Sequence, residues 1–294
     1  MPQKHSMVLI IKTIFVTLHK NKKVKISIEM EQYTNENLTL ESIYTSIESN
    51  GFTYYTLEKI DQYTQEILNG KTNLIQFNQQ EHAGLCCAGE VLIGAYIVCN
   101  YARKCLEASS DTSTSERIPS NWEIDELQEK LVQQWAEAKQ IWFANAEYDI
   151  ESEYGPIIAQ GAEAKVYYKT GDSSVIKLRT SIYATLSKAL EAIVLHNALF
   201  PETQMNVIGF MRDSDELFRF ILTQPYVGCK RLATKQEIDI LVGNLGFEDN
   251  WNGEGINYKS SRLSLEDMHP ANVFIDTISD KAICIDCIVK FIRK

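Results

Sequence analysis

The sequence predicts an α+β protein in two parts, with a mostly helical region over residues 1–150 and a strand-rich region over residues 151–294. Two observations support this division. Long segments with apolar residues at helical spacing end near residue 146, and short β-branched runs separated by turns begin at Tyr154. A length of 294 residues suits one large domain or two smaller ones, and the hydrophobic content of 45% is enough to build a core.

Composition and charge argue against several classes of function. A net charge of -10 disfavours nucleic-acid binding through a broad basic surface, so we expect no nucleic-acid partner. The apolar run 83–99 contains Glu90 and is short for a membrane span, so we expect a buried helix and no membrane partner. The seven cysteines are odd in number and scattered through apolar runs, which predicts free thiols and a cytoplasmic location.

The first region is expected to begin with a small hairpin, because residues 8–19 and 24–30 have strand character and flank the polar turn 20–23. Helices are predicted over residues 39–50, around residues 57–68 and over residues 81–108, followed by a Ser- and Thr-rich loop or linker at 109–120. Residues 122–146 give the clearest helical pattern, since Leu127, Leu131, Trp135 and Trp142 recur at helical spacing. We expect these side chains to form a core stripe.

The second region opens with three predicted strands, at residues 156–159, 165–168 and 175–178. The turn between the first two contains Gly161, an arrangement that suits a loop covering phosphates but also an ordinary hairpin. Lys177 lies inside the β-branched run of the third strand, where a lysine is rare unless it is paired or contacts a ligand. Glu191, on a predicted helix over 183–200, is the only acidic residue between Lys177 and Pro201. We therefore expect Glu191 to pair with Lys177, with a solvated helix face as the alternative for Glu191.

Residues 265–276 contain the segment around which the second region is organised. Asp267 and Asn272 are five residues apart on a loop broken by Pro270. In phosphoryl transfer, an aspartate orients the attacking group and accepts its proton, while an amide oxygen holds a metal ion near the phosphates. Asp286 ends a predicted strand at 282–286, and a hairpin with residues 273–275 would bring it beside Asn272 as a second metal-holding group. A polar surface loop and a strand-end cap are the alternatives, and His269 has no evident catalytic role.

Further strands at 206–211 and 217–222 and a helix at 235–245 complete the predicted order of elements. This order, from glycine turn through strand lysine and helix glutamate to D-x-x-x-x-N and strand aspartate, resembles the protein-kinase-like superfamily. The loop at 267–272 is more similar to that of aminoglycoside phosphotransferases than to H-R-D. Over about residues 150–294, the chain resembles the kinase-like domain of polyvalent proteins of phages and mobile elements. The similarity is carried by residues 161–163 with 166–167, by 224–225, by the helix end at 237–247 and by 265–273.

The resemblance implies a two-lobed kinase-like fold with a minimal C-terminal lobe, and an ATP- and Mg²⁺-dependent phosphotransferase, expected to be a protein Ser/Thr/Tyr kinase. The resemblance implies that Asp267 is catalytic and that Lys177 contacts the phosphates with Glu191 beside it. It also implies that Asn272 and Asp286 hold Mg²⁺. The Gly161 turn would cover the nucleotide, and the segment containing Gln224, Tyr226 and Val227 would line the adenine site as a hinge between lobes. The alternatives are a small-molecule kinase and a pseudokinase or partner-binding module without turnover.

Only eight residues follow Asp286, so the helices that usually bind a protein substrate are not expected after it. Phosphoryl transfer depends on positioning, and the acceptor needs a wall to lie against. We therefore expect residues 1–150 to pack against the second region, with the helix at 122–146 and its residues Trp135 and Trp142 as the main contact.

Overall fold

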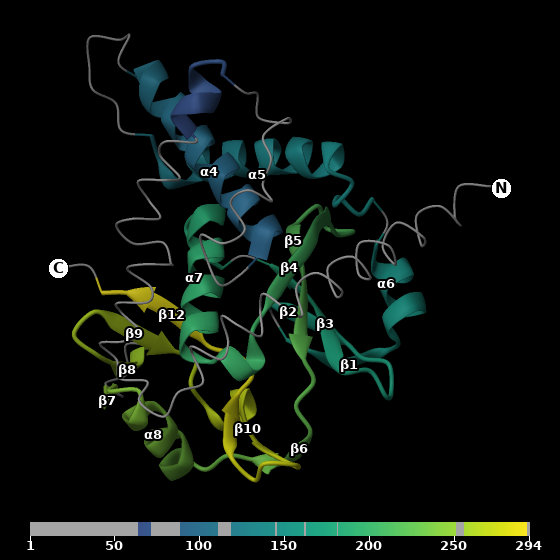
Figure 1. Ribbon diagram of the computed structural model, residues 1–294, viewed down its shortest axis with the longest axis vertical. Coiled ribbons are helices and arrows are strands. Elements are labelled where there is room, and N and C mark those ends of the chain that lie inside the picture. Colours follow the sequence, from purple (N-terminus) through teal and green to yellow (C-terminus); the bar gives the residue numbers. More distant parts are fainter. Residues whose placement is uncertain are drawn as a thin grey trace. The chain divides into compact units, whose positions relative to one another are not determined.

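The computed structural model describes residues 64–71, 89–110, 119–144, 146–161, 163–180, 182–250 and 256–292. The predicted hairpin at 8–30 and the predicted helix at 39–50 lie outside these residues, as does most of the linker at 109–120. Residues 64–68 are helical. The mixture of helices and antiparallel sheets that follows agrees with the predicted combination of helix and strand (Figure 1).

The central element is a five-stranded antiparallel sheet with the strand order β1-β2-β3-β5-β4. Its strands are β1 (Ile157–Gln160), β2 (Ala164–Tyr167), β3 (Ser174–Thr180), β4 (Asn206–Arg212) and β5 (Phe218–Pro225). The β-branched and aromatic residues of β3, β4 and β5 alternate between two buried faces, which explains why these three strands form the middle and one edge of the sheet.

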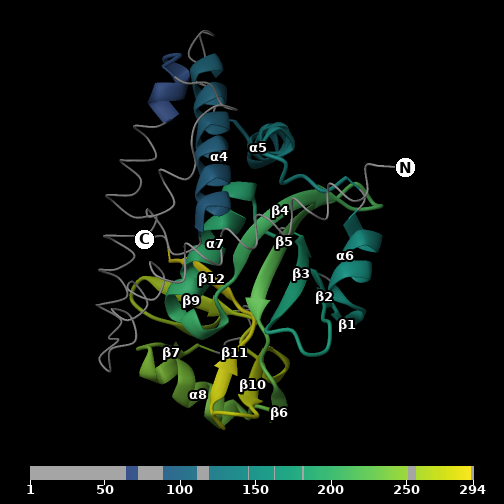
Figure 2. The same cartoon turned by 45° about the vertical axis from the view of Figure 1, so that its right-hand side comes forward.

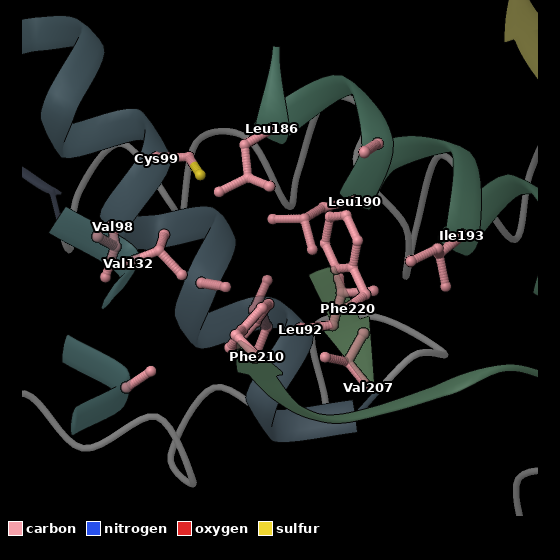
Figure 3. Packing of buried hydrophobic residues seen from close by; sticks show 14 of the residues in the cluster. Leu92, Val98, Cys99, Val132, Leu186, Leu190, Ile193, Val207, Phe210 and Phe220 are labelled. Carbon is pink, nitrogen blue, oxygen red and sulfur yellow. The ribbon is translucent and has the colours of Figure 1, made fainter. Parts of the chain in front are cut away.

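Helices cover both faces of this sheet, as Figures 1 and 2 show. The helices α4 (Gly89–Ser110), α5 (Asn121–Ala138) and α7 (Leu186–Leu199) share one buried cluster with β4 and β5 (Figure 3). The helix α6 (Ala146–Tyr154) packs on the opposite face through Ile150, against Tyr167, Ile176 and Ile221. The predicted packing of the N-terminal region on the second region is thus present for α4 and α5, and the predicted boundary at residue 150 falls inside α6.

The helix predicted over 122–146 was extended too far, because α5 ends at Ala138. Gln140 adopts a left-handed conformation with φ 60°, and Trp142 then forms a parallel bridge to Phe210 at the sheet edge. A Cβ on Gly209 would lie 2.3 Å from Phe143, so only glycine allows this segment to lie so close to β4. Trp142 therefore belongs to the sheet edge rather than to a helical stripe.

Two smaller sheets and a helix complete the described chain. One sheet has the order β11-β10-β6, from β6 (Cys229–Leu232), β10 (Val273–Asp276) and β11 (Ala282–Cys284). The other has the order β12-β9-β8-β7, from β7 (Glu248–Asp249), β8 (Ile256–Lys259), β9 (Leu263–Glu266) and β12 (Ile288–Phe291). The helix α8 (Lys235–Asn244) packs near both, and the short 3₁₀ turns are η2 (Pro201–Thr203) and η3 (Pro270–Asn272). Within the described residues, no helix has the length and apolar character needed to cross a membrane.

Candidate active site

Lys177 is a buried cation in the middle of β3, with only 4% of its surface exposed. Its Nζ donates to the backbone carbonyl of Ile285 at 2.9 Å and lies 3.4 Å from Asp286 Oδ2. The neighbours in β3, Ile176 and Leu178, point to the opposite face of the sheet and pack in the cluster that α6 covers. Strand alternation therefore directs Lys177 to the same face as α7 and toward the segment that carries Asp286.

The expected ion pair between Lys177 and Glu191 is absent from this structure. The carboxylate of Glu191 instead accepts two hydrogen bonds from Lys188 Nζ, both at 2.8 Å, within α7. Lysine and glutamate three residues apart lie on one helix face, so this local pair forms without any contact from the sheet. A contact between Glu191 and Lys177 requires a rearrangement, and it stays a prediction for the nucleotide-bound state.

Asp267 and Asn272 are held together on a loop between β9 and β10. Asp267 has a φ of 61°, a left-handed conformation that aspartate and asparagine adopt more readily than other non-glycine residues. Asn272 Nδ2 donates to the Asp267 carboxylate at 2.8 Å and to the Asp267 carbonyl at 3.0 Å. The Asp267 side chain is nevertheless 48% exposed. The loop thus presents a fixed carboxylate to solvent.

His269 has a more definite position than the sequence indicated. Its Nδ1 accepts a hydrogen bond from the backbone N–H of Ala271, so the neutral ring carries its proton on Nε2. Nε2 lies 3.0 Å from Asp267 Oδ1. Asp267 is therefore held on one oxygen by His269 and on the other by Asn272, which makes His269 a positioning residue for the carboxylate.

Asp286 returns to this loop through the predicted hairpin, in which β10 and β11 pair antiparallel with Val273 opposite Cys284. The backbone N–H of Ile285 donates to the Asn272 carbonyl at 2.9 Å, which places Asp286 directly after a contact with the loop. Burial on its own raises the pKa of Asp286, but the charges of Lys177 and Arg179 outweigh burial and hold that pKa well below its usual range. Asp286 is therefore ionised at neutral pH.

Two further residues at the site were not predicted as site residues: Arg179, and Glu163, which entered only within the segment 161–163 that carries the resemblance. Arg179, two positions after Lys177 on the same face of β3, places Nη1 3.4 Å from Asp286 Oδ1. Its Nη2 lies 3.8 Å from Glu163 Oε2, in the turn after Gly161. The signal was a second basic residue at strand spacing from Lys177. Four side chains thus alternate in charge across the site: Glu163, Arg179, Asp286 and Lys177.

The residues expected at the nucleotide base lie beside one another, but their side chains differ in direction. The Gln224 side chain is buried and donates to the carbonyls of Thr203 at 2.7 Å and Ile285 at 3.0 Å. Gln224 and Lys177 thus donate to the same carbonyl. Tyr226 is partly exposed, and its ring stacks on Tyr168 with 4.2 Å between centroids. Val227 follows Tyr226, and a base contact by this segment through backbone groups stays a prediction.

The turn at Gly161 lies between β1 and β2, where the Gly161 N–H donates to the Ala164 carbonyl at 2.9 Å. A Cβ at position 161 would meet no atom within 4 Å. The fold itself therefore does not require glycine at this position, and a covering role over a ligand stays a prediction.

The chemistry of Asp286 and Asn272 fits a magnesium ion shared with phosphates. Asp286 Oδ1 is buried and has no hydrogen-bond partner in the described structure. Asn272 uses its Nδ2 on Asp267, and within the described residues its amide oxygen accepts no hydrogen bond. In the part of the chain that the structure describes, no cluster of three or more His, Cys, Asp or Glu side chains is arranged to hold a metal. Magnesium is commonly bound by one or two protein oxygens together with substrate phosphates, and these two residues suit that mode.

Comparison with known proteins identifies the family. No curated protein matches the chain. A family model described as "Serine/Threonine/Tyrosine Kinase found in polyvalent proteins" matches residues 125–293, which includes most of α5 and extends through β12. The match covers more than half of the chain and agrees with the resemblance seen in the sequence. The chain therefore belongs to the family of serine/threonine/tyrosine kinases found in polyvalent proteins.

Proposed function

We propose that this chain is an ATP- and Mg²⁺-dependent protein kinase that transfers a phosphoryl group to a Ser, Thr or Tyr hydroxyl. The observation that carries the proposal is the meeting of Lys177, Asp286 and the Asp267–Asn272 loop in one place. Lys177 contacts Asp286, and the residue before Asp286 is hydrogen-bonded to Asn272. These residues come from β3, from the chain after β11 and from the loop before β10, so only the folded chain brings them together.

Each residue has a distinct role in this proposal. Asp267 orients the acceptor hydroxyl and accepts its proton, with His269 and Asn272 fixing the carboxylate. Lys177 contacts the phosphates, while Asn272 and Asp286 hold Mg²⁺, which neutralises charge on the phosphates when bound. The Gly161 turn covers the nucleotide, and the segment with Gln224, Tyr226 and Val227 lines the adenine site. Glu191 is proposed to approach Lys177 only when nucleotide is present.

A two-lobed arrangement is part of the same proposal. The five-stranded sheet with α7 would form one lobe, and the two smaller sheets with α8 would form a minimal second lobe. Residues 226–228 connect β5 to β6 and would act as the hinge. The acceptor is a protein hydroxyl in this proposal, and transfer to a small molecule is one of the outcomes that the experiment below distinguishes.

The test is phosphoryl transfer by the full chain from labelled ATP with Mg²⁺ to a protein lysate, compared with Asp267→Asn. Asparagine tolerates the left-handed backbone of residue 267, so the fold should be kept while the base is lost. We expect transfer to fall by about 10²–10⁴-fold, the usual contribution of a general base. The matched control is Asp280→Asn, because Asp280 also has a left-handed φ of 57° but lies on an exposed turn.

Nucleotide binding is measured in parallel through the melting temperature with Mg-ATP, since a ligand that binds only the folded state stabilises it. Asp267→Asn should keep this shift, and Asp286→Asn should lose its metal-dependent part. If the label is found only in small molecules, the acceptor is a small molecule and not a protein. A melting curve unchanged by millimolar Mg-ATP, together with no transfer, would refute the kinase and favour a partner-binding module.

A further inference from the structure

Arg179 is buried but only loosely paired. Its residue is 7% exposed, and a guanidinium carries five N–H donors that need partners when water is excluded. Among the described residues, its side chain makes one hydrogen bond, a long one of 3.9 Å to Met205 Sδ. Its two carboxylate contacts, 3.4 Å to Asp286 and 3.8 Å to Glu163, are longer than the roughly 2.7–2.9 Å of a charge-assisted hydrogen bond. Arg179 therefore lies between two acids without a close bond to either.

Asp286 is flanked by a protein cation on each oxygen. Lys177 lies at Oδ2 and Arg179 at Oδ1, both at 3.4 Å. A magnesium ion needs a carboxylate oxygen at roughly 2.0–2.1 Å. A metal ion on Oδ1 would lie close to the Arg179 guanidinium, where two positive charges in a poorly solvated site repel each other strongly. Metal binding at Asp286 and the present position of Arg179 therefore oppose each other.

Glu163 provides a second acceptor for the same guanidinium. Its backbone carbonyl accepts from Thr180 N at 2.8 Å, and Ala164 next to it pairs with Arg179 across the β2–β3 ladder. The side chain of Glu163 is 34% exposed, so its carboxylate has room to change its rotamer. Closing the 3.8 Å contact to hydrogen-bond length would draw Arg179 away from Asp286 and toward the Gly161 turn.

We propose that Arg179 is a resident counter-cation of the metal-binding aspartate: a divalent cation binds Asp286 in competition with Arg179, and the displaced guanidinium closes onto Glu163. The proposal rests on the proposed function for the role of Asp286 as a metal ligand. Arg179 thereby weakens metal binding in the absence of nucleotide. It also links the metal at Asp286 to the position of the turn that covers the nucleotide, because Glu163 lies two residues after Gly161.

The probe is Mn²⁺, whose free concentration is measured by electron paramagnetic resonance during titration of the full chain, without nucleotide and with ADP. Arg179→Met removes the competing charge and should tighten Mn²⁺ binding without nucleotide by about tenfold. Glu163→Gln replaces the charged acceptor of the displaced guanidinium by a neutral amide and should weaken Mn²⁺ binding. In the Arg179→Met background, Glu163→Gln should have no effect on Mn²⁺, because its partner is already absent.

The matched control is Arg219→Met, since Arg219 on β5 pairs at 2.6 Å with the buried Asp213 and, opposite Thr180 in the sheet, lies on the other face from Arg179. It should lower the melting temperature and leave Mn²⁺ affinity unchanged. If Arg179→Met behaves like this control, Arg179 is only a structural partner and the proposal is overturned. If Arg179→Met weakens ADP binding and leaves Mn²⁺ affinity unchanged, Arg179 is a phosphate ligand and the proposal is also overturned.

Three further outcomes keep the test decisive. Glu163 is partly exposed, so Glu163→Gln should fold even where Arg179→Met does not, and unchanged Mn²⁺ affinity in that variant refutes the competition. An absence of Mn²⁺ binding in both wild type and Arg179→Met refutes it as well. Competition observed in a chain that transfers no phosphoryl group would support this inference and refute only the proposed function.

Discussion

Trp135→Ala is expected to destabilise the whole described fold, although Trp135 lies on α5, well before the sheet in sequence. The Trp135 side chain is fully buried in the cluster that joins α4, α5, α7, β4 and β5. In this cluster, Val132 of α5 lies beside Val98 of α4, and the same cluster includes Leu190 of α7 and Phe210 of β4 (Figure 3). A cavity at position 135 would therefore open inside the cluster that holds α7 against the sheet.

The magnitude follows from the size of the side chain and its complete burial. Removing a buried tryptophan side chain costs about 3–5 kcal/mol, because apolar contacts are lost and the cavity collapses only partly. For a folded unit of roughly 150–250 residues, 1 kcal/mol shifts the melting temperature by about 2–4 °C, so we expect a decrease of about 6–20 °C. This is a large part of the total stability of a typical domain, which is about 5–15 kcal/mol.

The assay is thermal unfolding followed by circular dichroism, with and without Mg-ATP. Trp122→Ala is the matched control, because Trp122 lies on the same helix but is 67% exposed, so its removal should change stability by no more than about 0.5 kcal/mol. A single transition shifted downward in Trp135→Ala, but not in Trp122→Ala, is the expected result. A separate early transition, with the nucleotide-stabilised transition unchanged, would show that α4 and α5 fold independently and would refute the reasoning.

Three other predictions follow from the same contacts. The fragment 150–294 expressed alone should be insoluble or much less stable than the full chain, since it lacks α4 and α5; a fragment of full stability that binds Mg-ATP would contradict this. Burial raises the pKa of Asp125 to about 6, although its carboxylate accepts from Leu186 N at 2.6 Å, so its ionised form destabilises the fold above that pH. Asp125→Asn should therefore be more stable than wild type at pH 7.5, with an advantage that shrinks as the pH falls from about 6 to about 4 in urea titrations. Asp125→Ala removes the acceptor for Leu186 N and should be about 1 kcal/mol less stable than Asp125→Asn. Lys188→Met frees Glu191, and if Glu191 then pairs with Lys177, Mg-ATP should bind more tightly in calorimetry. If Lys188→Met and the double variant Lys188→Met with Glu191→Gln bind Mg-ATP with the same affinity, Lys177 is not the partner of Glu191.

Local patterns predicted the elements whose signals lie within a few residues. The β-branched run around Lys177 and the hairpin that returns Asp286 to Asn272 were both recognisable, because alternation and turn residues are short-range features. The strands β6 and β12 were not predicted, because each pairs with a strand that is distant in sequence. Leu232 of β6 pairs with Phe274, and Ile288 of β12 pairs with Glu266, so neither strand is specified by its own residues alone.

The partner of Lys177 shows why the site was harder to predict than the strands. Reasoning along the sequence considered only the acids of the following helix, and Glu191 was the one available. In the fold, a buried cation is stabilised by whichever anion the tertiary structure brings to it, and here that anion is Asp286, 109 residues away. Glu191 meanwhile has Lys188 within its own helix. For Glu191 to reach Lys177, its pair with Lys188 must open, and a metal ion on Asp286 would loosen the Lys177–Asp286 pair by competing for the same carboxylate. The expected contact and the present one are therefore alternatives, and a metal ion at Asp286, as proposed above, would favour the expected one.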